Sequence, residues 1–599
     1  MNRNKLLKRN IKKLNIRLDK CNQNSNKLSW IRLAIIISGF LITVLALFFS
    51  NELLSGIAIF IFLFVFTFAS YVHKKIKLSI KRYKLWLSIK TEHLNRAILH
   101  WTDIPVKNYT LNTHHPFAVD LDIIGEKSLH RLIDNTTSKN ASDRLLSWLL
   151  EQNPDPDLIN RRQELVSELI SLHSFRDTLS YQSKIVSEQE FDGNKFLSWL
   201  NKENKTIPGR LFFYGLISLA SVNIVLFVLN SMGLIPTYYT ISFTLYILLF
   251  ISKIKFIGSI FWEAIDLDDE IHKVSRNFLF LERYPFLKNS LISELLNPIR
   301  KATSKPSIIL RRLRILISLF GFSSNIIIKI LLNIVLPVDY ILAEIFLRNK
   351  EKIKKQIPEW LDCWYELEAL SALANYAWLN PEYVFPEFNT DKSLLNALQL
   401  GHPLIKKETK QTNDFHLDKI GDIILITGSN MSGKSTFLRT IGINICLAQA
   451  GSAVNAKAMT LQFMRLYTCI KIDDNLAEGL SYFYAEVKRL KQMLLELKSS
   501  DEYPLFYLID EIYKGTNNQE RLAGSRALIK ALSDKFGAGV VSTHDLELTG
   551  LETEMKTLQN FHFQEHIEKG KMVFDFKLRK GPCPTTNALI IMKNEGLPT

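Results

Sequence analysis

Two pairs of uncharged apolar runs stand out along this chain, separated by segments in which polar and apolar residues are mixed. The first pair covers residues 33–49 and 53–72. The second pair lies in the stretch 211–252, which has no charged residue and is interrupted at residues 230–236. Each run comes close to the ~20 residues that a helix needs to cross a bilayer. The pattern predicts two transmembrane helical hairpins, in preference to buried helices of a soluble core.

Basic residues flank both pairs. Residues 1–29 carry nine Lys or Arg against one Asp, Lys74 and Lys75 follow the first pair, and the second pair lies between Arg210 and Lys253. Flanks rich in Lys and Arg stay in the cytoplasm, so both termini are predicted there. The chain is therefore predicted to be a multi-pass protein of the cell (inner) membrane. A basic arm can also bind nucleic acid, but the apolar run behind it favours topology signals and contacts with lipid headgroups.

A third apolar stretch covers residues 315–346. It is interrupted by Lys329, Pro337, Asp339 and Glu344. Charged residues are costly inside a bilayer, so this stretch is interpreted as packed helices of the soluble body and not as a third membrane pair.

The remaining N-terminal segments predict helices. Residues 119–169 are mixed in charge, and the prolines at 154 and 156 end a helix there. Residues 359–378 place apolar side chains at i, i+3, i+4 and i+7, which predicts an amphipathic helix ended by Asn380 and Pro381.

Composition adds two limits. The chain has 599 residues, enough for several domains, and its hydrophobic content of 47% is high for a wholly soluble protein. Its five cysteines are scattered without a C-x-x-C pair, so neither a disulfide framework nor a zinc site is indicated.

The clearest chemical motif lies in residues 423–436. An apolar run that predicts a buried strand leads into G-x-x-x-x-G-K-S, followed by a predicted helix over 437–448. This is the phosphate-binding loop of ATPases, in which backbone N–H groups and the helix N-terminus face the phosphates. Lys434 is expected to reach the β- and γ-phosphates of ATP, and Ser435 to bind Mg²⁺. The predicted nucleotide-binding residues are Gly428, Ser429, Asn430, Met431, Ser432, Gly433, Lys434, Ser435 and Thr436.

Two further apolar strands end in candidate catalytic residues. Residues 504–511 end in Asp510, expected to hold Mg²⁺ through its water shell, and Glu511, expected to orient or deprotonate the attacking water. His544 follows a strand over 539–543 and is interpreted as a sensor of the γ-phosphate, since ligands gather at the carboxyl ends of strands in open α/β sheets.

Five segments in order resemble the MutS family of mismatch-repair ATPases. They are GSNMSGKSTFLRTIGINICLAQAGSAVNA (428–456), IDDNLAEGLSYFYAE (472–486), IDEIYKGTNNQER (509–521), STHDLELT (542–549) and KLRKGPCPTTNALIIMKNEGLP (577–598). Residues 128–169 and 367–403 are similar to the core and lever of that family. The resemblance implies a homodimer with composite ATP sites, in which Ser481 reaches the γ-phosphate held by the other subunit. It also suggests that Phe415 stacks on adenine, although a core aromatic is an equal alternative.

Departures from the family bear on its substrate. A membrane hairpin stands where the mismatch-reading domain should precede the core, and the second hairpin replaces the clamp of the lever. Ser142 stands where the core motif usually has glycine ahead of Arg144. DNA is therefore a possible partner that the sequence does not show. A transporter subunit and an ATP-switched membrane scaffold are the alternatives, but Glu478-Gly-Leu-Ser481 is unlike a transporter signature.

The predicted fold class is an α/β P-loop ATPase domain of the ABC/MutS-like type, preceded by an all-α core and lever that two transmembrane hairpins interrupt. The predicted segments are a basic arm (1–29), hairpin 1 (30–72), a basic helical linker (73–118), a core-like helical region (119–205), hairpin 2 (206–256), lever helices (257–395) and the ATPase domain (396–599).

Overall fold

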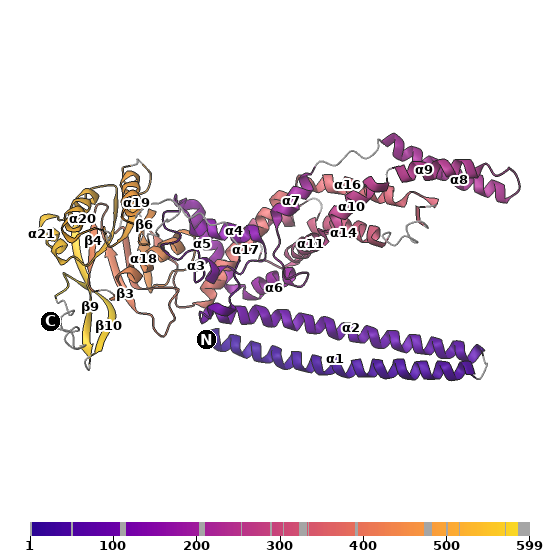
Figure 1. The fold of residues 1–599 in the computed structure, drawn as a ribbon, viewed down its shortest axis with the longest axis horizontal. Coiled ribbons are helices and arrows are strands. Elements are labelled where there is room, and N and C mark those ends of the chain that lie inside the picture. Colours follow the sequence, from indigo (N-terminus) through magenta and orange to yellow (C-terminus); the bar gives the residue numbers. More distant parts are fainter. Residues whose placement is uncertain are drawn as a thin grey trace.

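The molecule is elongated, with the α/β part at one end and helices α8 and α9 at the other (Figure 1). The computed structural model describes residues 3–48, 52–107, 115–202, 210–252, 254–287, 290–302, 305–322, 332–333, 335–389, 393–429, 431–471, 482–498, 501–513, 516–568 and 571–584.

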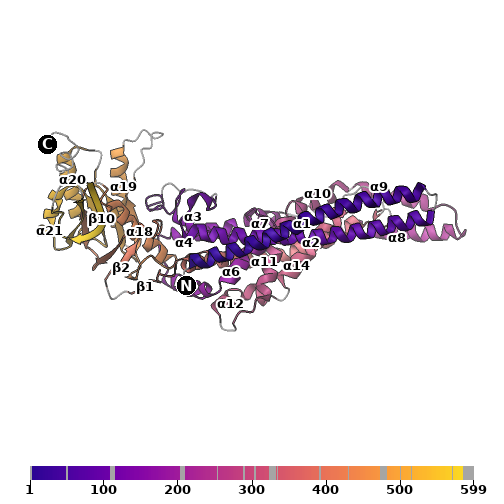
Figure 2. The ribbon, with the colours of Figure 1, turned by 90° about the horizontal axis from the view of Figure 1, so that it is seen from below.

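Two long antiparallel helices, α1 (Arg3–Phe48) and α2 (Glu52–Ala97), form the N-terminal hairpin. Figures 1 and 2 both show them side by side along the helical body, and in Figure 1 α2 lies between α1 and the body. The Ser25 hydroxyl lies 3.0 Å from Nε2 of His73, which fixes their pairing at mid-length. Both helices run without a break through the predicted boundaries at residues 29 and 73.

The outer half of this hairpin is apolar and exposed. Phe40 on α1 and Phe60 on α2 are each 70% exposed, where a water-soluble helix would carry polar side chains. By length and composition, three described helices could cross a membrane: α1, α2 and α8 (Arg210–Ser231). The partner of α8, α9 (Tyr239–Ser252), is apolar but has only 14 residues.

Helix α17 (Ile357–Leu379) lies at the centre of the helical body. The first half of α17 has the predicted exposed face, with Glu359 and Asp362 exposed, whereas every residue from Leu367 to Leu379 is buried. Neighbouring helices pack against α17, which explains the burial of its second half. They are α3 (Leu129–Ile133), α4 (Lys139–Leu149), α5 (Pro156–Ser171), α6 (His173–Lys184), α13 (Asn297–Arg300) and α16 (Val338–Lys354).

A helical arm connects this body to α8 and α9. The stretch 315–346 lies partly in this arm, where Leu316 and Phe346 are buried and Phe320 stacks on Phe261 with ring centroids 3.8 Å apart. Its described residues thus belong to packed helices, while 323–331 and 334 lie outside the described part of the chain. The arm consists of α7 (Gly193–Asn201), α10 (Ile254–Ile265), α11 (Asp268–Arg283), α14 (Pro306–Phe322) and α16, whereas α12 (Leu291–Leu295) packs on α5 of the body.

The C-terminal part contains two sheets. A four-stranded sheet has the order β1 (Glu387–Phe388), β5 (Ala458–Leu461), β2 (Leu395–Gly401), β3 (Thr412–Leu417). A six-stranded sheet has the order β10 (Lys571–Lys580), β9 (Leu558–Glu568), β4 (Ile423–Thr427), β8 (Gly537–Thr543), β7 (Leu505–Asp510), β6 (Arg465–Cys469). The helices of this part are α18 (Lys434–Gln449), α19 (Tyr482–Glu496), α20 (Asn518–Leu532) and α21 (Leu551–Glu554).

The six-stranded sheet is parallel except for β10, and helices cover both of its faces. Alternate residues of β4 show this arrangement: Ile424 and Ile426 pack in the core that contains α18, while Ile423 and Leu425 pack in the core that contains α20. Strands that are buried on both faces appear in the sequence as continuous apolar runs, and these runs allowed β4, β7 and β8 to be predicted. The fold is therefore α/β at the C-terminus and largely helical before it.

Candidate functional site

The glycine-rich loop begins where β4 ends, and α18 begins where the loop ends. Gly428 and Gly433 have φ angles of 144° and 106°, which only glycine adopts without strain. A Cβ atom on Gly428 would lie 2.5 Å from the carbonyl oxygen of Phe563 on the neighbouring strand β9. The loop can therefore turn back over the sheet edge only with glycine at this position, and it delivers the N-terminus of α18 to that edge.

Lys434, the first residue of α18, points back over the loop. Its ammonium group donates hydrogen bonds to the carbonyl oxygens of Gly428, at 2.8 Å, and Ser429, at 3.0 Å. The residue is only 4% exposed, so water screens its charge little. The predicted phosphate-binding lysine is thus placed at the mouth of the loop.

The two acidic residues and the histidine lie at the ends of β7 and β8, and β8 separates β7 from β4 in the sheet. Asp510 ends β7 and is 7% exposed, with a carboxylate that accepts a hydrogen bond from the Ser542 hydroxyl. Glu511 follows with a left-handed φ of 57°, and its carboxylate contacts Nε2 of His544. Nδ1 of His544 lies 2.9 Å from the Gly428 carbonyl oxygen and 3.2 Å from Nζ of Lys434. Gly428, Glu511 and His544, which directly follow β4, β7 and β8, are therefore linked by contacts through the His544 ring.

The loop also fits a polyanion and its metal ion. The hydroxyl of Ser432 is buried without a hydrogen-bond partner among the described residues, and it faces Gly428 inside the loop. A buried hydroxyl of this kind is costly unless a ligand oxygen satisfies it. Ser435, in the first turn of α18, and Asp510 supply the hard oxygen ligands that Mg²⁺ prefers.

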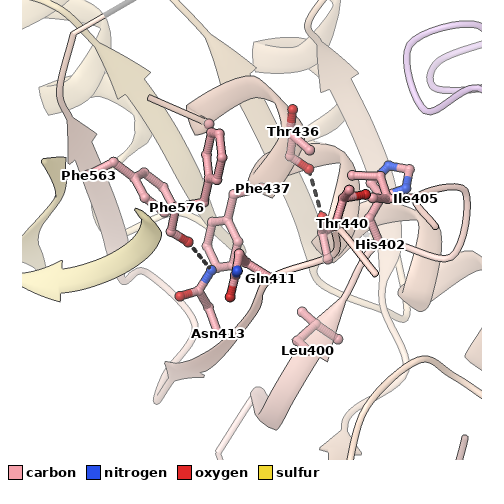
Figure 3. A pocket seen from close by; sticks show the side chains of 12 residues that line it. Leu400, His402, Ile405, Gln411, Asn413, Thr436, Phe437, Thr440, Phe563 and Phe576 are labelled. Carbon is pink, nitrogen blue, oxygen red and sulfur yellow. Dashed lines mark hydrogen bonds between the residues drawn. The ribbon is translucent and has the colours of Figure 1, made fainter. Parts of the chain in front are cut away.

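A cavity of about 270 Å³ opens beside the first two turns of α18 (Figure 3). Thr436 and Phe437 of α18 form one wall, and Phe576 of β10 forms another. His402 also lines the cavity, and burial lowers its pKa to about 4, so it is neutral at physiological pH. The complete lining is Leu400, His402, Ile405, Thr409, Gln411, Asn413, Gly433, Thr436, Phe437, Thr440, Phe563 and Phe576.

Phe415 does not line this cavity. It is 3% exposed, and its ring packs against that of Phe437 with centroids 5.7 Å apart. The exposed aromatic ring is that of Phe576, whose carbonyl oxygen accepts a hydrogen bond from Asn413 at 3.0 Å. Sequence reasoning missed Phe576, although the alternation of Phe574 and Phe576 along one strand was a usable signal.

Two predicted site residues, Asn430 and Ser481, lie outside the described residues, as does the whole segment 472–481. Of the neighbouring α19, Glu486 is buried and its carboxylate accepts a hydrogen bond from the backbone N–H of Tyr513, just after Glu511. This contact joins α19, which follows residues 472–481, to the acidic end of β7.

Comparison with known proteins relates this site to one family. Residues 424–599 match the family model described as MutS domain V. The chain is 34% identical over 263 residues to the DNA mismatch repair protein MutS of Lactobacillus johnsonii, which covers 43% of this chain and 30% of that protein. It is 33% identical over 264 residues to the DNA mismatch repair protein MutS of a Geobacillus species, with the same two shares. The chain thus matches about 30% of the length of these curated relatives.

Proposed function

This chain belongs, through its C-terminal part, to the MutS family, and from that premise we propose that it is a membrane-anchored ATPase that acts in a dimer. The observation that carries the proposal is the meeting of Lys434, Glu511 and His544 at the carboxyl ends of adjacent strands. Three side chains from distant parts of the sequence converge beside a glycine-rich loop that fits a polyanion.

Each residue of the site then has a defined task in ATP hydrolysis. Lys434 and the loop N–H groups would bind the β- and γ-phosphates, and Ser435 and Asp510 would hold Mg²⁺, which would supply neutralisation of the phosphate charge. Glu511 orients the attacking water and accepts its proton. His544 holds the Glu511 carboxylate in place, and it lies close enough to the loop to sense the γ-phosphate.

The cavity beside α18 is suited to the nucleoside of ATP. It adjoins Gly433 and Thr436 of the phosphate site, and its walls are largely apolar and aromatic with a few polar groups, as is usual for nucleotide pockets. We assign base stacking to Phe576 in preference to Phe415, because only Phe576 presents its ring to this cavity.

The exposed apolar helices support membrane anchoring. The outer halves of α1 and α2 lie at the same end of the molecule as the α8–α9 pair, away from the ATPase domain (Figure 1). Large exposed apolar surfaces of this extent mark a membrane or protein contact. Both hairpins can thus enter one bilayer while the ATPase domain stays in the cytoplasm. The two hairpins stand apart in Figure 1, which disfavours a conduit between the spans of one chain.

Dimerisation would complete the ATP site. By resemblance, Ser481 serves a nucleotide bound to a second copy, and twofold symmetry would give each subunit the serine of the other. Confinement to one membrane raises the effective concentration of the two subunits.

We propose that the ATP-driven conformational change acts on DNA, because the relatives are described as DNA mismatch repair proteins. The test is ATP turnover by the purified full chain with plain, mismatched and branched DNA at one stated salt concentration. We expect turnover without DNA and a change in its rate with at least one DNA. Turnover that no DNA alters would contradict the DNA role and leave the ATPase intact, whereas no turnover at all would contradict the ATPase.

A further inference from the structure

Almost all the net charge of the chain lies in one place. Residues 3–29 of α1 hold nine basic residues against Asp19, and residues 73–97 of α2 hold eight against Glu92. These two segments, here called the basic stalk, therefore carry a net charge of +15, against +16 for the whole chain. They pair along their length, since Ser25 bonds to His73 and Leu7 shares an apolar cluster with Leu94.

Most charges of the basic stalk face solvent without an acidic partner among the described residues; Lys90 and Arg96, which pair with Asp177 and Glu92, are the exceptions. Fourteen of its basic side chains are exposed, and none of them forms an ion pair with a residue in the described part of the chain. On α1 they recur every three or four residues, which aligns them along the helix. They are Lys5, Lys8, Arg9, Lys12, Lys13, Arg17, Lys20, Lys27, Lys74, Lys75, Lys77, Lys81, Arg82 and Lys84.

Helix α1 packs on α17 near its base, through Leu7, and the outer side of its basic part is open. Helix α2 docks on the body through its own buried residues: His93 bonds to Asp177 of α6 at 2.8 Å, and Trp86 stacks on Tyr181. Helix α1 lies on the outer side of α2 (Figure 1). The charges of α1 therefore form an outward surface that runs from the base of the hairpin towards the apolar half.

Membrane lipids are too far away to neutralise the lower stalk. Exposed Trp30 and Tyr71 mark the start of the apolar half, where aromatic residues favour the lipid–water interface. At a rise of ~1.5 Å per residue, Lys13 lies about 26 Å from Trp30 along the helix and Lys5 lies about 38 Å from it. The attraction of anionic headgroups fades within a screening length of about 8–10 Å. Topology and lipid binding thus account for Lys27, Lys74 and Lys75, but not for the charges between Lys5 and Arg17.

We propose that the lower part of the basic stalk binds double-stranded nucleic acid through its phosphate backbone, without reading the base sequence. The phosphate backbone of a duplex is a continuous polyanion, long enough to match a row of charges along α1. Residues 3–29 contain no aromatic side chain, so they lack the stacking surfaces that single-stranded nucleic acid requires. Asn10, Asn15 and Asn22 lie among the charges and can donate further hydrogen bonds to phosphates.

This inference rests on the DNA role proposed above and gives it a location. It also assigns to α1 a task beyond anchoring, because the helix would hold a duplex beside the membrane and next to the ATPase domain. The ATP site itself is not involved, so ATP turnover without DNA serves as an independent check of folding.

The test is duplex binding by the full chain in nanodiscs of zwitterionic phosphatidylcholine, measured by the anisotropy of a labelled 40-base-pair DNA between 50 and 200 mM salt. The stalk variant combines Lys5→Gln, Lys8→Gln, Arg9→Gln, Lys12→Gln and Lys13→Gln. The control variant loses five exposed lysines of the body: Lys195→Gln, Lys352→Gln, Lys355→Gln, Lys419→Gln and Lys556→Gln. Both variants lower the net charge equally and should keep wild-type ATP turnover.

We expect the stalk variant to bind the duplex at least about tenfold more weakly at 100 mM salt, with a shallower salt dependence, since each lost phosphate contact removes about 0.9 from the slope. The control variant should bind within about twofold of wild type. The proposal is overturned if both variants bind equally, or if the wild-type chain binds no duplex. It is also overturned if the stalk variant differs from wild type only in binding vesicles that contain phosphatidylserine, because the stalk would then serve lipid. Wild-type binding that survives in the stalk variant would place the DNA site elsewhere without contradicting the DNA role.

Discussion

The carboxylate of Glu92 is one of the buried groups that dock the N-terminal hairpin on the body. Its oxygen atoms lie 2.8 Å from Nη2 of Arg96 on the same helix and 2.9 Å from Nζ of Lys184 on α6. The side chain is 11% exposed. Glu92→Gln keeps its shape and removes its charge, which leaves two cations at the junction without their shared partner.

The pKa of Glu92 sets the size of the expected effect. Burial alone would raise this pKa, but the Arg96 and Lys184 cations outweigh burial and lower it from 4.5 to about 2. A difference of this size corresponds to roughly 3 kcal/mol of folding free energy. Because the folded-state pKa lies below the unfolded value, the stabilisation is complete above pH 4.5 and is lost as the pH falls towards 2.

Thermal unfolding in detergent, followed by tryptophan fluorescence, measures this contribution. Trp86 stacks on Tyr181 at the same junction, with ring centroids 5.1 Å apart, so its emission contributes to the measured signal. At pH 7 we expect Glu92→Gln to lower Tm by about 2–5 °C, and the difference from wild type to shrink to less than about half at pH 3. Glu188→Gln, at an exposed carboxylate, should leave Tm unchanged within about 1 °C. An unchanged Tm in Glu92→Gln, or a difference that persists undiminished at pH 3, would refute the reasoning.

Three further predictions concern the proposed site and topology. Lys434→Ala should abolish ATP binding, and mixing it with inactive Ser481→Arg chains should restore some turnover, because one site of a mixed dimer pairs an intact loop with an intact serine. No recovery in a mixture that crosslinking shows to contain heterodimers would count against catalysis in trans. Phe576→Ala should weaken ATP binding by about 1–3 kcal/mol in a fluorescent-nucleotide assay, whereas an unchanged affinity would remove Phe576 from the base pocket. In a cysteine-free background, Met232→Cys should react with an external thiol reagent in intact cells, whereas Lys535→Cys should not; labelling of Lys535→Cys would overturn the topology.

The phosphate loop could be predicted from the sequence because its chemistry is local. Strand, loop and helix follow one another within residues 423–449, so the spacing alone placed Lys434 at the helix start. The strands ending at Asp510 and Thr543 were recognisable as apolar runs, since a parallel sheet buries both faces. The direct contact between His544 and Glu511 was not predictable, because it depends on the order of β8 and β7 in the sheet.

Long-range packing explains what the sequence did not show. Phe576 reaches the cavity from a strand more than a hundred residues after α18, and no local pattern connects the two. Helix α17 has an amphipathic pattern, yet neighbouring helices bury both faces of its second half, Leu367 to Leu379. The basic arm was interpreted as a membrane flank because the length of α1 was unknown. As one helix from Arg3 to Phe48, α1 carries its first charges far from the apolar half.

ATP hydrolysis by the proposed site is the central claim, and Glu511→Gln tests it most directly. The substitution removes the proton acceptor and keeps the shape of the side chain, while Lys434 and the loop remain intact. Full-length wild type and Glu511→Gln, purified in the same detergent, are compared for MgATP binding and for phosphate release. We expect equal ATP binding, with turnover in the variant reduced by about 10²-fold or more. Hydrolysis by Glu511→Gln at the wild-type rate would contradict the assignment of Glu511 and, with it, the proposed mechanism.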